Sequence, residues 1–249
     1  MDMRHHLEER LKTLRLPGIL ENLDIRTNQA QENRLGYLEY LSFLIQDEYE
    51  SRSANSLKKA IRSANFGEEK TLEGFDFQFN QKWIPQATVR DLGTCTFIEN
   101  KKNIVMAGPT GIGKTHLAKS LGHEACRRRY SVLFTKTYSV LENLQDDLSR
   151  SQLMKLWRKL VRTDLLIFDD FGFRKMTPKE AELFYSLVDE RLGKGSMIFT
   201  SNRPPEDWMG LFPDPVIGGA ILDRIVSDAH KIISTEGKSY RKSRPKNSV

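Results

Sequence analysis

The fold is decided by one stretch, Gly108-Pro109-Thr110-Gly111-Ile112-Gly113-Lys114-Thr115. An apolar run at 104–107 precedes it and a helical pattern over 115–129 follows it, so a strand, a glycine loop and a helix succeed one another. The spacing G-x-x-x-x-G-K-T is that of a loop that cradles the phosphates of a nucleoside triphosphate. Glycines let successive backbone N–H groups point at one anion, and the helix start adds the positive end of its dipole. An ordinary glycine turn is the alternative, and the Lys-Thr pair argues against it.

The residues of this loop have separate expected tasks. Lys114 is expected to reach the β- and γ-phosphates, and the Thr115 hydroxyl is expected to bind Mg²⁺. The predicted nucleotide-binding set is Gly108, Pro109, Thr110, Gly111, Ile112, Gly113, Lys114, Thr115 and His116.

A second apolar run, 165–168, predicts a buried strand that ends in Asp169 and Asp170. Carboxylates at the tip of a central strand would lie beside the phosphate loop. We expect Asp169 to hold Mg²⁺, directly or through water, and Asp170 to orient the attacking water or accept its proton. The alternative, a polar strand end without chemistry, is disfavoured by the phosphate loop upstream.

Asn202 follows the fourth predicted strand in chain order, 197–200. A strand-end amide between the γ-phosphate and the acidic pair can polarise the attacking water, so Asn202 is a predicted catalytic residue together with Lys114 and Asp170. On its own, such an asparagine is usually a turn former. No N-K-x-D guanine reader follows Asp169-x-x-Gly172, so ATP is favoured over GTP.

Arg224 lies on a predicted helix beyond the fourth strand. From there it cannot easily reach its own phosphate loop, but it can reach that of a neighbouring subunit. An arginine finger of this kind accelerates phosphoryl transfer by ~10³–10⁵. The alternative is a surface pair between Asp223 and Arg224 within one chain, and the spacing does not choose between the two.

Composition indicates a soluble globular protein. The chain has 249 residues, a net charge of +6 and 39% hydrophobic residues, and it contains no apolar run of the roughly 20 residues that would span a bilayer. The N-terminus lacks the apolar core of a secretory signal, and the two cysteines, Cys95 and Cys126, form no metal or disulfide framework. We therefore expect a cytoplasmic protein, and the basic balance suits a polyanionic partner.

From residue 103 onward strands and helices alternate, which predicts a parallel α/β sheet. Strands are expected at 104–107, 132–134, 165–168, 197–200 and 231–233, and helices at 115–129, 137–149, 151–162 and 177–193. The region 1–66 is expected to be a separate helical domain that binds DNA or a partner, and 67–249 the nucleotide-binding domain with a basic tail. A solvated helical bundle without a ligand is the alternative for 1–66.

Apolar spacing sets the expected faces of the first helices. Leu7, Leu11 and Leu14 fall on one helical face, and the break at 16–18 precedes a second helix. The third helix has an apolar stripe, which is made of Leu38, Leu41, Leu44, Ile45 and Tyr49.

Further on, Phe75-Asp76-Phe77-Gln78-Phe79 precedes the first strand. In nucleotide-binding folds, a segment at this place often covers the nucleotide base.

These motifs resemble those of the AAA+ ATPases, and in particular the initiator and helicase-loader branch. The finer similarity is to the IstB proteins, the ATP-dependent helpers encoded beside the transposase in bacterial insertion sequences. It covers nearly the whole chain, and four stretches carry it: 14–18, 75–77, 222–224 and 237–241.

The resemblance implies a P-loop fold with a small helical N-terminal domain. It further implies an ATP- and Mg²⁺-dependent homo-oligomer with ATP sites at subunit interfaces. This oligomer is expected to bind and deform double-stranded DNA and to recruit a cognate transposase at the bacterial nucleoid.

The chain departs from the family pattern at two places. Asp170 stands where AAA+ enzymes commonly carry Glu. Only 25 residues follow Arg224, too few for the usual helical lid, and Arg241 is the candidate substitute for the lid arginine.

Two rival functions remain open. A DnaC-like helicase loader shares the ATPase core, although some loaders grip the helicase with a cysteine-bearing zinc module, and here no cysteine precedes Cys95. The other rival is a structural DNA-binding protein that uses ATP only as an assembly ligand, which the short Asp170 side chain allows.

Overall fold

The computed structural model describes residues 3–79, 83–145, 149–237 and 239–240. The chain divides into two compact units, Met1–Lys59 and Ala60–Val249. This division falls inside one helix, whereas the sequence suggested a domain boundary after residue 66. The end of that helix belongs to the second unit, because Ala64 is fully buried and the ring of Phe66 stacks on His123 at 4.5 Å.

The first unit is built from three helices: α1 (Met3–Thr13), α2 (Pro17–Glu32) and the start of α3 (Tyr37–Ala64). Leu11, Ile19, Leu23 and Leu44 form its small core. Gly18 is required here, since a Cβ would lie 2.5 Å from the carbonyl oxygen of Asp47. The buried Glu48 carboxylate accepts hydrogen bonds from the Gly18 and Ile19 amides at the start of α2.

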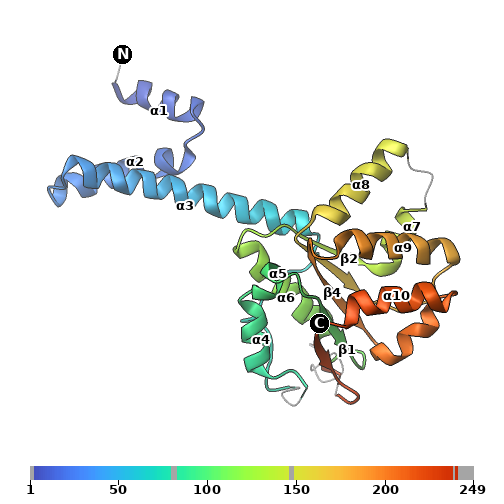
Figure 1. Cartoon of the computed structure of the whole chain (residues 1–249). Helices are drawn as coiled ribbons and strands as arrows, with labels where there is room; N and C mark the ends of the chain where they lie inside the picture. Colours follow the sequence, from blue (N-terminus) through green and yellow to red (C-terminus); the bar gives the residue numbers. More distant parts are fainter. Residues whose placement is uncertain (1–2, 80–82, 146–148, 238, 241–249) are drawn as a thin grey trace, which may run out of the picture. The chain divides into compact units, whose positions relative to one another are not determined.

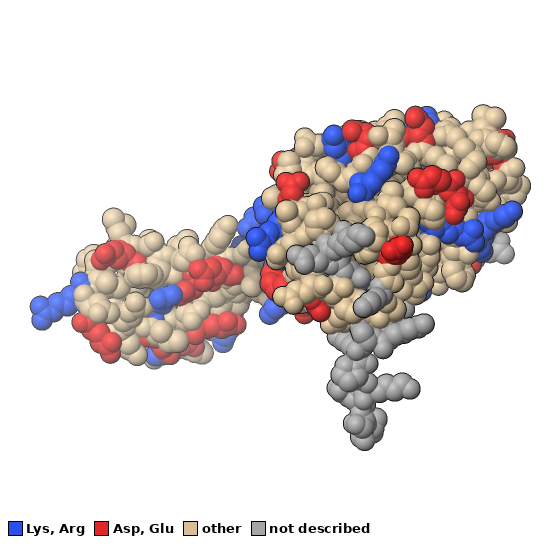
Figure 2. Space-filling model, turned by 90° about the horizontal axis from the view of Figure 1, so that it is seen from below, with Lys and Arg blue, Asp and Glu red and all other residues tan. Residues whose placement is uncertain are grey.

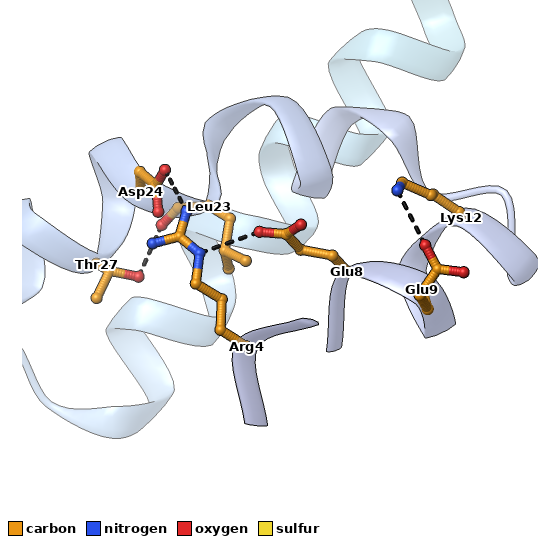
Figure 3. A network of polar contacts seen from close by, with 7 residues as sticks. All are labelled: Arg4, Glu8, Glu9, Lys12, Leu23, Asp24 and Thr27. Atoms are coloured by element: carbon orange, nitrogen blue, oxygen red, sulfur yellow. Dashed lines mark hydrogen bonds and ion pairs between the residues drawn. The ribbon is translucent and has the colours of Figure 1, made fainter. Parts of the chain in front are cut away.

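A polar network also joins α1 to α2 (Figure 3). Arg4 donates to Glu8 at 3.0 Å within α1 and to Asp24 of α2 at 2.6 Å. Arg4 and Asp24 are exposed to solvent and Glu8 is half-buried, so the network contributes little to stability.

The predicted apolar faces of α1 and α3 are mostly exposed to solvent. Leu11 and Leu44 are buried, but the other members are at least 44% exposed, namely Leu7, Leu14, Leu38, Leu41, Ile45 and Tyr49. The reason is that the core of the first unit is small, with only Leu11, Ile19, Leu23 and Leu44 as its buried members among the described residues. Periodicity identifies such a face, but it does not say whether a partner covers it.

The second unit is an α/β domain around a five-stranded parallel sheet (Figure 1). Its spatial order is β2-β3-β4-β1-β5, with all neighbours parallel. The strands are β1 (Ile104–Ala107), β2 (Val132–Lys136), β3 (Leu165–Asp169), β4 (Ser196–Ser201) and β5 (His230–Ile233). Every residue of β1, β3 and β4 is buried, as expected for central strands of a parallel sheet.

Helices cover both faces of the sheet and make three layers. Helix α6 (Lys114–Arg127) packs on the face that carries Ile167, where a Cβ on Gly122 would contact that side chain. The opposite face carries Phe168 and Phe199, which pack against Phe184 of α9 (Pro178–Arg191). The remaining elements are α4 (Gln86–Gly93), α5 (Thr96–Glu99), α7 (Thr137–Asn143), α8 (Arg150–Arg162), the 3-10 turn η1 (Pro205–Leu211) and α10 (Pro215–Val226).

The predicted strands and the four predicted helices are confirmed, with shifts at their ends. The helix expected over 137–149 ends at Asn143, and Ser149 instead caps α8 through a hydrogen bond from the Gln152 amide. The short elements α4, α5 and η1 were not predicted, because each is too brief to show a helical period. Among the described residues, no helix is both long and apolar enough to cross a membrane.

Candidate functional site: a nucleotide-binding loop beside an acidic strand end

The phosphate loop begins where β1 ends, between its neighbours β4 and β5. Gly111 and Gly113 have φ angles of +89° and +107°, in the region that favours glycine. Gly113 is the N-cap of α6, so the loop leads directly into a helix N-terminus. The expected strand, loop and helix are therefore present, and the loop has the backbone conformation that its glycines allow.

Lys114 lies folded back over this loop. Its Nζ donates to the carbonyl oxygens of Gly108 at 2.7 Å and Pro109 at 2.9 Å, and to Oδ1 of Asn202 at 2.8 Å. The residue is only 9% exposed, so its charge is held within the site. The structure thus brings together Lys114 and Asn202, which lie 88 residues apart in the sequence.

Asp169 lies next to the first turn of α6. The Thr115 hydroxyl donates to Asp169 Oδ1 at 2.8 Å, and the Thr200 hydroxyl donates to the same oxygen at 2.5 Å. The Asp169 side chain is buried, at 4% exposure. One carboxylate and one hydroxyl in contact are oxygen donors that suit Mg²⁺, which usually completes its shell with water and substrate phosphates. Consistent with so small a donor set, no group of three or more His, Cys, Asp or Glu that could hold a metal occurs in the described residues.

Asp170 is the first residue beyond β3 and has a left-handed backbone, with φ +54°. Its amide donates to Thr200 Oγ1 at 3.2 Å, and its carboxylate lies 3.9 Å from Lys136 Nζ. Its side chain is partly exposed, at 36%, whereas that of Asp169 is buried. The two carboxylates therefore have different surroundings, which suits one to metal binding and the other to contact with water.

Thr200 and Lys136 were missed by sequence reasoning. Both are strand-end residues of neighbours of β3, and the register pairs Lys136 directly with Asp169. The available signal was a polar residue at the carboxyl end of each predicted parallel strand, and the sequence analysis used it for Asp169, Asp170 and Asn202 but not for Lys136 or Thr200.

Arg224 is engaged within its own chain. Its guanidinium contacts Asp189 of α9 at 2.9 Å and lies over the Tyr185 ring at 5.0 Å. The predicted alternative of an intrachain surface pair named Asp223, but the acidic partner is Asp189, one helix away. In the described part of the chain, the Arg224 side chain hydrogen-bonds to residues of α9 and α10.

His116, the last member of the predicted nucleotide set, faces the segment before β1. Its Nε2 lies 3.2 Å from the Thr71 carbonyl oxygen, and its ring meets that of Phe75 edge-on at 5.2 Å. The aromatic segment expected near the base therefore does border the loop. Lys238 and residues 241–249, including Arg241, lie outside the described residues.

Comparison with known proteins decides the family. The profile described as "IstB-like ATP binding protein" matches residues 9–248. The chain belongs to this family. The IstB-like chain is 38% identical to a Mycobacterium tuberculosis protein named as an ATP-binding protein in an insertion sequence, over 94% of this chain and 93% of that protein. It is also 34% identical to the ATP-binding protein of insertion sequence IS21 from Pseudomonas aeruginosa, over 95% and 89%.

Solved structures share the fold of this IstB-like chain. DnaI matches with a TM-score of 0.58 and 18% identity, over 71% of this chain and 93% of that one. The DnaC helicase loader matches with a TM-score of 0.52 and 19% identity, over 70% and 98%. These likenesses confirm the predicted P-loop α/β fold.

Proposed function

We propose that this chain is an ATPase that regulates transposition. It assembles on double-stranded DNA with ATP bound, deforms that DNA, recruits a cognate transposase and hydrolyses ATP. The observation that carries the ATPase part is the pairing of Thr115 with Asp169 beside Lys114 and Asn202. The names of relatives that span nearly the whole chain support the insertion-sequence part.

Each side chain has one task in this proposal. Lys114 leaves its loop carbonyls to bind the β- and γ-phosphates, and Asn202 keeps contact with the γ-phosphate side. Thr115 and Asp169 hold Mg²⁺, which neutralises charge that develops on the phosphates. Asp170 orients the attacking water, and Thr200 fixes both acidic residues through one hydroxyl.

The Lys136 ammonium beside Asp170 has to be considered in this scheme. At 3.9 Å, this partly exposed pair places a positive charge beside the carboxylate that is proposed to orient water. It also competes with water for that carboxylate. Movement of Lys136 away from Asp170 is therefore expected to accompany hydrolysis.

Duplex DNA is proposed to bind the exposed side of α8. This helix buries Leu160 and turns five basic residues to solvent, which are Arg150, Lys155, Arg158, Lys159 and Arg162. On the face shown in Figure 2, by contrast, basic and acidic side chains are interspersed. A one-sided basic helix is the kind of surface that contacts DNA phosphates, and the affinity of such a surface for DNA falls steeply with salt.

Residues 1–66 are proposed to serve as the second DNA- or partner-binding domain.

ATP turnover with and without long duplex DNA tests this proposal. Wild-type protein should hydrolyse ATP and do so faster with duplex, and Lys114→Ala should bind no nucleotide. Asp170→Asn should bind ATP, turn it over at least about a hundredfold more slowly, and stay on DNA as a trapped oligomer. A fully active Asp170→Asn protein would refute the role given to Asp170, and a protein without turnover in all conditions would favour the purely structural alternative.

A helicase loader is the second candidate, because the fold likeness to DnaC and DnaI covers about 70% of the chain. Capture of a replicative helicase instead of binding to long duplex would favour it.

A further inference from the structure

The last turn of α10, which carries Arg224, is held at its backbone by one side chain from another element. Asn103 lies just before β1 and is only 9% exposed. Its Nδ2 donates to the carbonyl oxygens of Arg224 at 3.2 Å and Ile225 at 3.4 Å. Carbonyl groups in the last turn of a helix have no partner within the helix, so Asn103 supplies a donor that the helix itself lacks.

The other carbonyl groups at this end of α10 have partners of a different kind. Those of Asp223 and Val226 accept hydrogen bonds from backbone amides of the residues that follow the helix. The two carbonyls between them are the ones that Asn103 serves. Removal of the Asn103 amide group would therefore loosen the backbone at Arg224, the expected arginine finger.

Asn103 is itself fixed to the sheet. Its Oδ1 accepts a hydrogen bond from the Met197 amide at the start of β4, at 2.9 Å. Its backbone carbonyl accepts one from the His230 amide at the start of β5, also at 2.9 Å. Because β1 has Asn103 before it and the phosphate loop after it, one strand connects the clamp on α10 to the nucleotide site.

The Arg224 side chain is held less firmly than its backbone. Its guanidinium contacts Asp189 at 2.9 Å and lies over the Tyr185 ring, and the ion pair is partly exposed. Such a pair can be exchanged for another anion at little cost. Buried bonds thus hold the backbone and exposed ones hold the side chain, so the guanidinium can turn towards a phosphate while the helix stays in place.

We propose that Asn103 is a positioning residue for Arg224. It holds the last turn of α10 so that the guanidinium can reach phosphates bound by a neighbouring copy of the chain. The inference rests on the proposed function, in which an assembly hydrolyses ATP, and on a role of Arg224 between subunits. A displacement of about 1 Å at a catalytic group can cost roughly a hundredfold in rate, so a bond far from the phosphates can control turnover.

ATP turnover by mixed variants on long duplex DNA tests the proposal. Asn103→Asp keeps the shape of the side chain and the acceptor for the Met197 amide, but it removes the donor to α10. It should bind ATP like wild type and hydrolyse it at least about tenfold more slowly. Its phosphate loop is intact and its arginine is misplaced. Lys114→Ala subunits, which keep Arg224, should therefore restore turnover in a mixture, whereas Arg224→Ala subunits should restore none.

The matched control is Ser196→Ala at the start of β4. The Ser196 hydroxyl also donates a buried hydrogen bond, to the Phe97 carbonyl oxygen at 3.1 Å, but it has no bond to α10. This variant should lose stability to urea and keep wild-type turnover. Asn103→Ala should show the same pattern of restoration as Asn103→Asp, and it replaces that variant if the buried carboxylate prevents folding.

Wild-type turnover in both Asn103 variants would overturn the inference. Restoration by Arg224→Ala subunits would also overturn it, because Asn103 would then act on the phosphate loop of its own chain. Absence of restoration by Lys114→Ala subunits would show a loss of fold and no positioning role. The proposed function survives each of these results if wild type hydrolyses ATP, and a wild type without turnover would refute it.

Discussion

At the scale of single residues, the site depends on one oxygen atom. Oδ1 of Asp169 accepts hydrogen bonds from Thr115 and from Thr200, and the Thr200 hydroxyl also accepts from the Asp170 amide. Thr200 therefore fixes the positions of both acidic residues without being acidic itself. We regard it as a positioning residue.

Replacement of Thr200 tests this role. Thr200→Val keeps the shape of the side chain and removes the hydroxyl, so the Asp169 carboxylate loses a donor and the Asp170 backbone amide loses its acceptor. Loss of a group that orients a metal ligand costs about 10–100-fold in metal affinity or activity, and we expect a rise of that order in the Mg²⁺ concentration needed for half-maximal ATP turnover. Thr135→Val on β2 is the control, with no expected effect. An unchanged Mg²⁺ requirement in Thr200→Val would contradict the assignment.

At the scale of elements, Arg191 of α9 ties three elements together. It is fully buried, and its guanidinium donates to the carbonyl oxygens of Leu160 and Thr163 at the end of α8 and of Ser196 at the start of β4. Burial lowers the pKa of Arg191 to about 10, which leaves it charged at neutral pH.

Arg191→Met should be strongly destabilising, because it leaves several buried carbonyl groups without donors. We expect a loss of about 3 kcal/mol in the free energy of unfolding, measured by urea denaturation. Arg158→Met, on the exposed side of α8, should change it by less than about 0.5 kcal/mol. Equal stability of the two variants would show that Arg191 does not join these elements.

The start of α9 gives a pH-dependent prediction. Glu180 and Thr177 cap each other, and the Arg174 side-chain hydrogen bonds lower the pKa of the buried Glu180 carboxyl from 4.5 to about 2. Because the folded pKa lies below the unfolded one, this stabilisation is complete above pH ~4.5 and is lost as the pH falls towards 2. Wild type should therefore exceed Glu180→Gln in unfolding free energy at pH 7, and the difference should shrink between pH 4.5 and 3. A constant difference would contradict this assignment.

The sequence predicts some parts of the fold and of the candidate site better than others. The capped start of α9, the buried strands and the Lys114–Thr115 loop were predictable, because each has a local pattern with one structural solution. The contacts of Thr200 with Asp169 and of Asn103 with Arg224 were not, because they depend on register and on distant segments meeting in space. Leu38 and Tyr49 show the converse: they belong to a clear apolar stripe, but the first unit leaves both exposed.

At the scale of the whole molecule, the role of Arg224 decides whether a single chain can hydrolyse ATP or needs a neighbouring subunit. Its contact with Asp189 occupies it within the chain, so an arginine finger would have to exchange this partner for the phosphates of a neighbouring subunit. The pair is partly exposed, and its disruption therefore costs little.

Mixing of inactive variants tests a role between subunits. Arg224→Ala and Lys114→Ala should each lack ATP turnover alone. Mixed assemblies contain interfaces with an intact loop facing an intact Arg224, so some turnover should return. Absence of any recovery, with both variants assembling normally, would favour a role of Arg224 within its own chain.

The mass of the particle formed on DNA tests the central claim most directly. The account holds that the nucleotide lies between copies of the chain, so wild type with long duplex and a non-hydrolysable magnesium-ATP analogue should form particles of several times the 28.8 kDa chain mass. Lys114→Ala should remain small under the same conditions. Wild-type particles of a single chain mass, with nucleotide and duplex both saturating, would contradict the account.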